Sequence, residues 1–264
     1  MSLTVAVAQF APTADKAANL SVIADLLRQA SRRGARLVVL PEYSVFTVPA
    51  MDERFVESAE PLDGPTVARL AELSRELDLT VVAGVNETGD ADRMRNTLVG
   101  LQAGELKAVY RKTHLYDAFG YKESDRVIAS DLGRPELLEV DGFTVGMQTC
   151  YDLRFPEVTR TLVDAGADVV ALPAEWVPGP LKEYHWNTLV RARAIENTVY
   201  VLAADQCAPT GAGNSAVVDP MGVALAGVGE VQGLGVAVVE RERLDQVRTV
   251  NPALDLRRYR VVPR

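Results

Sequence analysis

The chain has 264 residues, of which 48% are hydrophobic and 24% charged, so it can bury a large core without disulfides or metal ions. It carries 28 Lys and Arg residues against 36 Asp and Glu residues, and the net charge of -8 argues against a nucleic-acid partner. Its two cysteines, Cys150 and Cys207, are too few for the disulfide framework of a small secreted protein, so a reducing compartment is expected.

The first residues predict a strand and no export signal. Leu3–Gln9 is apolar and rich in β-branched residues, and the residues before it lack the basic region and cleavage site of a signal peptide. No run in the chain reaches the roughly 18 apolar residues that a membrane span requires. We therefore expect a cytoplasmic protein without a membrane partner.

A strand–helix–strand rhythm follows. Asp15–Arg33 carries apolar residues at helical spacing and ends at Gly34, which predicts an amphipathic helix. A second helix is expected over Pro65–Leu77, and buried strands over Arg36–Leu40 and Thr80–Val85. This alternation favours parallel strands covered by helices.

The alternation is interrupted by a hairpin and then resumes. Asn96–Leu101 and Leu106–Tyr110 flank the glycine turn Ala103–Glu105. The elements expected after the hairpin are strand Phe143–Thr149, helix Pro156–Ala165, strand Asp168–Leu172, helix Trp186–Glu196, strand Val199–Ala204, strand Gly213–Val218, turn Asp219–Gly222, strand Gly233–Glu240 and a short final helix. Two similar halves without a linker between them predict one α/β domain over residues 1–264.

Three polar residues stand at the ends of apolar strands, where ligand crevices form in α/β sheets. They are Glu42, Lys112 and Cys150. Taken singly, a cysteine there is more often a small buried hydrophobe, and a glutamate or lysine a surface charge. The combination is more informative than any one of the three.

A thiol needs a base or a nearby cation to react at neutral pH, because its ordinary pKa is about 8.5. Glu42 would accept the thiol proton of Cys150 and pass it to a departing ammonia. Lys112 would stabilise the tetrahedral oxyanion together with the backbone N–H of Tyr151. Together these groups make an amide-cleaving site without a histidine.

The histidines do not suggest another mechanism. Only His114 and His185 are present, and neither they nor the cysteines have zinc-ligand spacing or a cysteine-protease signature, so no metal is expected. His114 is interpreted either as a packed loop residue or as a group that orients the site. The basic stretch Leu256–Arg260 is interpreted as a solvated surface or a subunit contact.

Several sequence blocks resemble the nitrilase (carbon-nitrogen hydrolase) superfamily along nearly the whole chain. The blocks are Val5–Gln9, Leu40-Pro41-Glu42, Tyr110–Leu115, Cys150-Tyr-Asp-Leu-Arg-Phe-Pro-Glu157 and Arg191–Asn197. The resemblance implies a four-layer α-β-β-α sandwich, dimerisation or higher assembly, a thioester intermediate and no cofactor.

The same resemblance adds two site residues. Glu123 matches a second family glutamate that positions the substrate or Lys112, although by itself it would pass as a solvated loop charge. Trp176 is either part of the acyl pocket or a buried structural aromatic.

Within the superfamily the chain looks nearest to the ω-amidases and deaminated-glutathione amidases, judging by Cys150–Glu157 and by Tyr184-His185-Trp186. This predicts hydrolysis of a small linear amide to a carboxylate and ammonia. The segment Val177–Pro180 departs from the amidase pattern, so an N-carbamoyl compound or a nitrile remains an alternative substrate. A non-catalytic binding or assembly module is the alternative from a different class, and the presence of all three polar residues argues against it.

Overall fold

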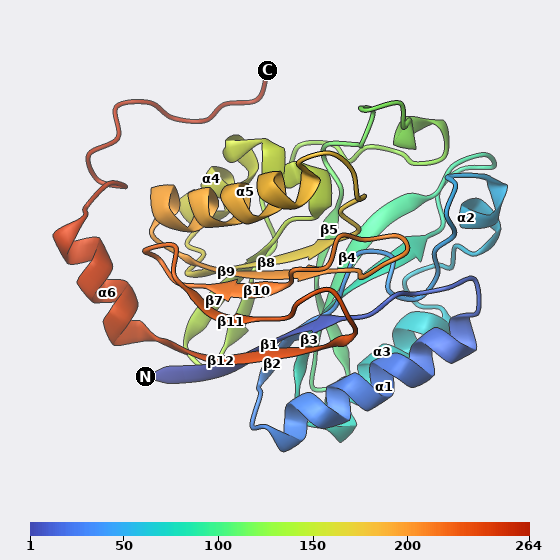
Figure 1. Ribbon diagram of the computed structural model, residues 1–264, viewed down its shortest axis with the longest axis horizontal. Coiled ribbons are helices and arrows are strands. Elements are labelled where there is room, and N and C mark those ends of the chain that lie inside the picture. Colours follow the sequence, from blue (N-terminus) through green and yellow to red (C-terminus); the bar gives the residue numbers. More distant parts are fainter.

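A computed structural model describes all residues, 1–264, and contains two six-stranded sheets packed face to face with helices outside (Figure 1). The strands are β1 (Ser2–Gln9), β2 (Leu37–Val39), β3 (Thr80–Glu87), β4 (Arg95–Gln102), β5 (Glu105–Arg111), β6 (Leu138–Val140), β7 (Phe143–Met147), β8 (Val169–Ala174), β9 (Tyr200–Asp205), β10 (Ala216–Val218), β11 (Ala224–Gly227) and β12 (Gly233–Glu240). The helices are α1 (Lys16–Arg32), α2 (Glu53–Glu57), α3 (Pro65–Glu76), α4 (Pro156–Asp164), α5 (Lys182–Asn197) and α6 (Arg241–Val250), with short 3₁₀ turns at Glu123–Asp125 and Cys150–Arg154.

The two sheets repeat one pattern. The first has the order β12-β1-β2-β3-β4-β5 and the second β6-β7-β8-β9-β10-β11. In each sheet the second, third and fourth strands are parallel, and each strand outside them pairs antiparallel with its neighbour. The two halves of the chain are therefore similar in the arrangement of their strands. The last strand, β12, completes the sheet of the first half.

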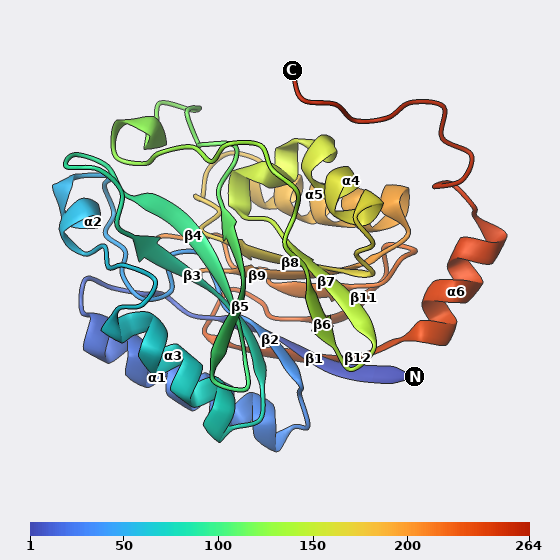
Figure 2. The same ribbon diagram turned by 180° about the vertical axis from the view of Figure 1, so that it is seen from behind.

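The apolar pattern explains why the sheets are buried on both faces. Along β1, Leu3, Val5 and Val7 enter the core between the sheets, while Ala6 and Ala8 contact the helices. A strand covered on both faces reads as a continuous apolar run, as β1 does. Helices α1 and α3 cover the first sheet, and α4 and α5 cover the second, as the view from behind also shows (Figure 2). The expected four-layer α-β-β-α sandwich is confirmed.

Local signals set the helix and turn boundaries as expected. The carboxylate of Asp15 accepts a hydrogen bond from the N–H of Ala18 at 3.0 Å and caps α1, which ends before Gly34 in the left-handed region. Ala103 and Gly104 both have positive φ and join β4 to β5 in a tight hairpin. This hairpin brings the residue after β5 back toward the end of β2.

Some elements differ from the sequence expectation. Helix α2 and the short edge strands β6 and β11 were not expected, because segments of three to five residues carry too little periodicity. The strand expected from Gly213 is shorter, since Gly213 and Asn214 have positive φ and only Ala216–Val218 pairs with β9. Helix α5 begins at Lys182, four residues before the expected start at Trp186.

The C-terminal segment runs over the surface beyond α6. Arg257 forms an ion pair with Asp164 on α4 at 2.6 Å, and Tyr259 is 93% exposed. The basic stretch is thus a surface segment in this chain, with one of its arginines tied to a helix. The helices of the protein are all too short or too polar to cross a lipid bilayer.

Candidate active site

Glu42, Lys112 and Cys150 meet at one end of the sandwich although they are far apart in the sequence. Glu42 follows β2, Lys112 follows β5 directly, and Cys150 begins the 3₁₀ turn after β7. Their exposed fractions are 1%, 2% and 7%, so all three are buried. The Nζ of Lys112 lies 2.9 Å from Oε1 of Glu42. The strand ends therefore bring a thiol, a carboxylate and an ammonium into one water-poor site.

Cys150 is held on a sharp turn. Its φ of 45° lies in the left-handed region, which a cysteine adopts only at a cost of about 1–3 kcal/mol. Such a conformation persists because the surrounding contacts impose it. The turn aims the thiol at the main-chain oxygen of Glu175, which it contacts at 3.5 Å.

Asp152 supplies the contacts that hold this turn. Its fully buried carboxylate accepts hydrogen bonds from the N–H of Thr149 at 3.2 Å and the hydroxyl of Tyr110 at 2.6 Å. The other oxygen accepts the N–H of His114 at 3.0 Å and contacts the Nδ1 of the same residue at 2.9 Å. The carboxylate thus ties the turn at Cys150 to the segment that carries Lys112.

Replacing this carboxylate should weaken both stability and turnover. Asp152→Asn places an amide N–H₂ against donors and is expected to cost about 1–3 kcal/mol in the free energy of unfolding. Denaturant unfolding and amide hydrolysis would measure the two effects. Asp25→Asn, at an exposed ion pair with Arg28, is the control and should change neither quantity appreciably. An Asp152→Asn variant as stable and as active as the wild type would contradict this role.

The carboxylate of Glu42 is fixed from three sides. Oε1 accepts hydrogen bonds from Lys112 and from Nδ2 of Asn96, the latter at 2.6 Å. Oε2 accepts the N–H of Glu175 at 2.8 Å. Because the carbonyl of Glu175 contacts the Cys150 thiol, a single residue connects the thiol to the carboxylate. The carboxylate of Glu42 and the thiol of Cys150 are therefore held in a defined relation.

Glu123 completes the charge arrangement. Its Oε2 lies 2.8 Å from Nζ of Lys112, and Tyr43 and Asn96 donate hydrogen bonds to its Oε1. At 2% exposure it is far from the solvated loop charge that its local sequence allows. The backbone N–H of Tyr116 donates a hydrogen bond to Oε2 of Glu123 at 2.6 Å. Glu123 is therefore bonded within the loop that follows Lys112.

The charges around Lys112 and Glu123 set the protonation of these two groups. Burial alone would lower the pKa of Lys112, but the charges of Glu123 and Glu42 raise it well above its ordinary value. Burial is the largest single effect on Glu123 and raises its pKa, but the charge of Lys112 together with the hydrogen bonds from Lys112, Tyr116 and Tyr43 lowers the pKa overall. The lysine is therefore an ammonium and Glu123 a carboxylate at neutral pH. Two N–H groups of the ammonium bind the glutamates, which leaves the third for a ligand.

The thiol is protonated at rest. Burial, followed by the negative charge of Glu42, raises the pKa of Cys150 well above its ordinary value, and the opposing effect of Lys112 is smaller. A thiol in this state is a poor nucleophile until its proton is removed. A reaction at this thiol would therefore require a base, and Glu42 is a carboxylate close enough to affect the pKa of the thiol.

A glycine on β3 makes room for Glu42. A Cβ on Gly84 would lie 2.6 Å from both the Cα of Glu42 and the N of Tyr43, closer than real atoms approach. Gly84→Ala is therefore expected to push the carboxylate out of place and to lower kcat by about 10²-fold. The matched control is Gly133→Ala, where a Cβ has open space and no change is expected. Normal hydrolysis by Gly84→Ala would show that the position of Glu42 does not matter.

A small pocket opens onto the thiol. Its lining residues are Tyr116, Cys150, Tyr151, Glu175, Trp176, Val177 and Lys182. Trp176 is only 2% exposed, and its Nε1 donates to the carbonyl of Lys182 at 2.8 Å, so it is both a pocket wall and a buried structural aromatic. Tyr151 follows Cys150 in the 3₁₀ turn and packs edge-on against Tyr116 with ring centroids 5.1 Å apart. Both sequence candidates thus lie at the pocket.

His114 lies outside the pocket. Its ring stacks on Phe155 at a centroid distance of 3.7 Å and contacts Asp152. It therefore packs in the loop and acts on the site only through Asp152. No group of three or more His, Cys, Asp or Glu side chains is arranged to hold a metal ion.

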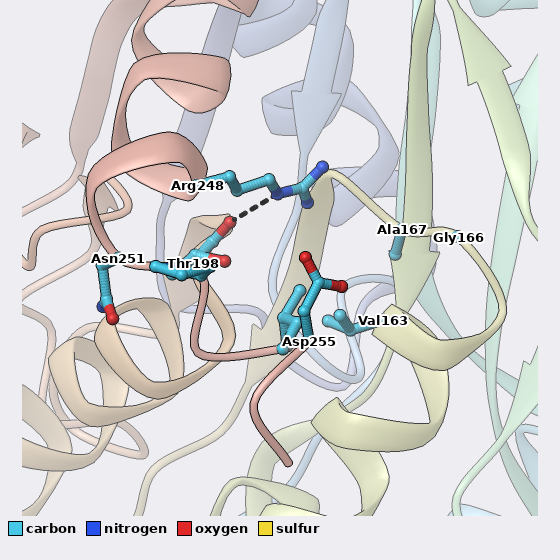
Figure 3. A pocket seen from close by; sticks show the side chains of 9 residues that line it. Val163, Gly166, Ala167, Thr198, Arg248, Asn251 and Asp255 are labelled. Carbon is cyan, nitrogen blue, oxygen red and sulfur yellow. Dashed lines mark hydrogen bonds between the residues drawn. The ribbon is translucent and has the colours of Figure 1, made fainter.

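A second cavity, of about 250 Å³, lies away from these residues, between the end of α4 and the C-terminal segment (Figure 3). Two charged residues line it, Arg248 and Asp255, and Arg248 donates to the carbonyl of Thr198 at 3.3 Å and pairs with Asp168 at 3.0 Å. The lining contains no thiol and no base beside a nucleophile. The small pocket at Cys150 is therefore the better candidate for chemistry.

Several residues of the site were missed in the sequence. Asn96, Tyr43 and Glu175 hold the carboxylates of Glu42 and Glu123, yet the sequence analysis assigned none of them to the site. For Asn96 a signal existed, since an amide at the start of a strand that is otherwise buried needs a partner. For Glu175 the contribution comes from backbone atoms, which a sequence does not reveal.

Known proteins resemble this chain along nearly its whole length. The family model described as carbon-nitrogen hydrolase matches residues 4–249. A deaminated glutathione amidase of Escherichia coli O157:H7 is 42% identical over 257 residues, covering 97% of this chain and 98% of the relative.

Solved structures have the same fold. A carbon-nitrogen hydrolase from Helicobacter pylori G27 superposes with a TM-score of 0.88 at 24% identity, covering 98% of this chain and 96% of the other. A carbon-nitrogen hydrolase superfamily protein from Xanthomonas campestris, which has an arsenic adduct in its active site, gives a TM-score of 0.87 at 28% identity and covers 100% of both chains. The chain therefore belongs to the carbon-nitrogen hydrolase family, within the nitrilase superfamily, and is an enzyme that cleaves amide C–N bonds.

Proposed function

We propose that the protein hydrolyses a small linear amide to a carboxylate and ammonia through a thioester on Cys150. This proposal depends on the two backbone contacts of Glu175. Its carbonyl contacts the thiol of Cys150, and its N–H donates a hydrogen bond to the carboxylate of Glu42. A protonated, buried thiol beside a fixed carboxylate suits a reaction in which the proton leaves as the sulfur attacks.

In the acylation step, Sγ of Cys150 attacks the amide carbon and Glu42 takes the thiol proton. The C–N bond breaks as Glu42 returns that proton to the nitrogen, and ammonia departs. The free N–H of the Lys112 ammonium and the backbone N–H of Tyr151 stabilise the oxyanion of the tetrahedral intermediate. Glu123 holds Lys112 in position through its ion pair.

In the deacylation step, Glu42 removes a proton from water and the resulting hydroxide attacks the thioester carbon. The C–S bond breaks, the proton returns to the sulfur and the carboxylic acid leaves. One carboxylate therefore acts as base and then as acid in each half-reaction, which is consistent with a single buried glutamate at the thiol.

The substrate class needs a direct comparison. The similarity to a deaminated glutathione amidase favours a linear amide over an N-carbamoyl compound or a nitrile. We expect ammonia release from linear amides to exceed that from carbamoyl amines and nitriles when all three are assayed in parallel. Release mainly from a carbamoyl amine or a nitrile would move the assignment to that substrate, and release from none would favour a non-catalytic module.

We further propose that the protein is a cytoplasmic homodimer or a larger homo-oligomer, as the family resemblance implies. Apolar side chains on the surface of one protomer support it, among them Ile195 on α5 and Leu225 on β11, which are 45% and 42% exposed. Sedimentation equilibrium should give at least twice the mass of 28.6 kDa. A mass equal to that of one chain would contradict the proposal.

A further inference from the structure

The side chain of Glu175 is an acidic group that the proposed mechanism does not use. The mechanism uses only its backbone, whose carbonyl contacts the thiol of Cys150 and whose N–H binds the carboxylate of Glu42. We call these two contacts the backbone bridge. The carboxyl of the same residue lies close to both groups, so its charge and its contacts bear on how the bridge is held.

The site contains three glutamates and one ammonium within pairing distance of them. The Nζ of Lys112 lies 2.9 Å from Oε1 of Glu42 and 2.8 Å from Oε2 of Glu123, and Glu175 forms no ion pair. An unpaired carboxylate in a water-poor site is costly, and a further negative charge beside Glu42 adds repulsion. Burial, followed by the charge of Glu42, raises the pKa of Glu175 well above its ordinary value. The arrangement therefore favours an uncharged carboxyl at Glu175.

The hydrogen bonds of this carboxyl suit the uncharged form. Its Oε2 accepts from the hydroxyl of Thr47 at 3.1 Å and from Nε2 of Gln206 at 3.3 Å. The carbonyl oxygen of a neutral carboxylic acid accepts two hydrogen bonds in this way, and the other oxygen carries the proton. Oε1 forms no hydrogen bond with the protein, so it is free for that proton.

The two donors also belong to the surroundings of Glu42. Thr47 lies in the loop that follows Glu42, and Nε2 of Gln206 donates a second hydrogen bond, to the main-chain oxygen of Glu42, at 2.8 Å. Both donors are buried, and the hydroxyl of Thr210 donates to Oε1 of Gln206 at 2.5 Å, which fixes the orientation of the amide. The side chain of Glu175 is thus tied to the segment whose carboxylate its backbone binds.

Other titratable groups close to Glu175 come from several parts of the chain. They are Cys150, Tyr121 and Asp205, with Tyr116, Tyr151 and Lys182 in the same pocket. Burial raises the pKa of Asp205 well above its ordinary value, and Lys182 donates to the hydroxyl of Tyr116 at 3.0 Å. None of these groups forms an ion pair with Glu175.

We propose that Glu175 is a positioning residue, whose uncharged carboxyl, bonded by Thr47 and Gln206, fixes the backbone bridge between Cys150 and Glu42. This inference rests on the proposed amidase function. Glu175 then acts on the reaction through the thiol and through Glu42, and the hydrogen bonds of its carboxyl matter while a negative charge on it does not.

The first experiment tests the missing charge. Glu175→Gln keeps the shape of the side chain and an oxygen for the two donors, but it cannot ionise. A carboxyl whose folded pKa is raised contributes stability below the ordinary value of 4.5, and that contribution is lost as the pH rises toward the folded value. In urea unfolding between about pH 5.5 and 7.5, the unfolding constant of the wild type should therefore rise about 10-fold per pH unit relative to that of Glu175→Gln.

The control for this experiment is Glu57→Gln, at an exposed glutamate without an ion pair. Its unfolding constant should follow that of the wild type at every pH. Parallel pH curves for the wild type and Glu175→Gln would mean that Glu175 is ionised in the folded protein, and they would overturn the proposal.

The second experiment tests the positioning by amide hydrolysis at pH 7. Glu175→Gln should keep kcat within about 3-fold of the wild type, whereas Glu175→Ala, which loses both hydrogen bonds, should lower kcat by about 10²-fold. If Glu175→Ala does not fold, Thr47→Val removes one donor and should lower kcat by about 10-fold, and Thr47→Ser should restore it. Full activity of the alanine or valine variant, or a loss in Glu175→Gln as large as in Glu175→Ala, overturns the proposal.

A wild type that cleaves no amide would contradict the proposed function but would still leave Glu175 testable. The unfolding comparison does not depend on activity. The rate at which iodoacetamide alkylates Cys150, followed by peptide mass, reports on the thiol and its base. This rate should be similar in the wild type and Glu175→Gln and at least about 10-fold lower in Glu175→Ala. Equal rates in all three proteins overturn the positioning role.

Discussion

Cys150→Ala should abolish amide hydrolysis, with turnover falling by more than about 10⁴-fold, because no other group in the pocket can form the acyl intermediate. The thiol is small, its one hydrogen bond is the weak contact with the carbonyl of Glu175, and alanine fills most of its volume. Thermal unfolding should therefore change little. Ammonia release under saturating substrate and a calorimetric Tm measure the two quantities.

Cys207 offers a matched control within the same chain. It is buried to a similar extent, at 6% exposure, but it does not line the pocket. Cys207→Ala should keep nearly full activity. Substantial turnover by Cys150→Ala, or loss of turnover only in Cys207→Ala, would remove Cys150 from the mechanism.

Lys112→Met should impair both chemistry and folding. Loss of the oxyanion contact is expected to lower kcat by about 10² to 10³-fold. The same change leaves Glu42 and Glu123 buried without their cation, which typically costs about 3–5 kcal/mol in the free energy of unfolding. Initial rates and urea unfolding at pH 7 would measure both effects.

The pH dependence separates this explanation from a general packing defect. In the wild type the lowered pKa of Glu123 contributes stability at pH values above the ordinary 4.5, and that contribution is lost as the pH falls through the lower folded value. In Lys112→Met the unpaired carboxylates should have raised pKa values, so the variant should lose stability as the pH rises. Adding Glu123→Gln should restore part of the stability but not the activity. A variant with the wild-type pH profile would contradict the buried ion-pair account.

The sequence predicts the reactive groups because their placement depends on simple rules. Glu42 and Cys150 follow the parallel strands β2 and β7, and Lys112 follows β5, the second strand of the β4–β5 hairpin. The four-layer arrangement follows from strands that are apolar on both faces and helices that are apolar on one. The chemistry of a thiol, a carboxylate and an ammonium then limits what the site can do.

The supporting groups could not be predicted in the same way. Asn96 and Tyr43 become important only because β3, β4 and the loop after β2 converge, which depends on packing across segments distant in sequence. Glu175 acts through its backbone, and its side chain appears in the sequence as an ordinary surface charge until the contacts of its carboxyl are known. The left-handed conformation of Cys150 is likewise imposed by tertiary contacts, since cysteine does not favour it.

The central claim is that the acyl group passes through the sulfur of Cys150. The most direct test is to mix the wild-type enzyme with a linear amide that it hydrolyses, quench with acid during steady state, and analyse the digested protein by mass spectrometry. We expect the peptide that contains Cys150 to gain the mass of the acyl group, with the mass absent when substrate is omitted. Ammonia release without any acyl group on Cys150, or an acyl group on a different residue, would contradict the claim.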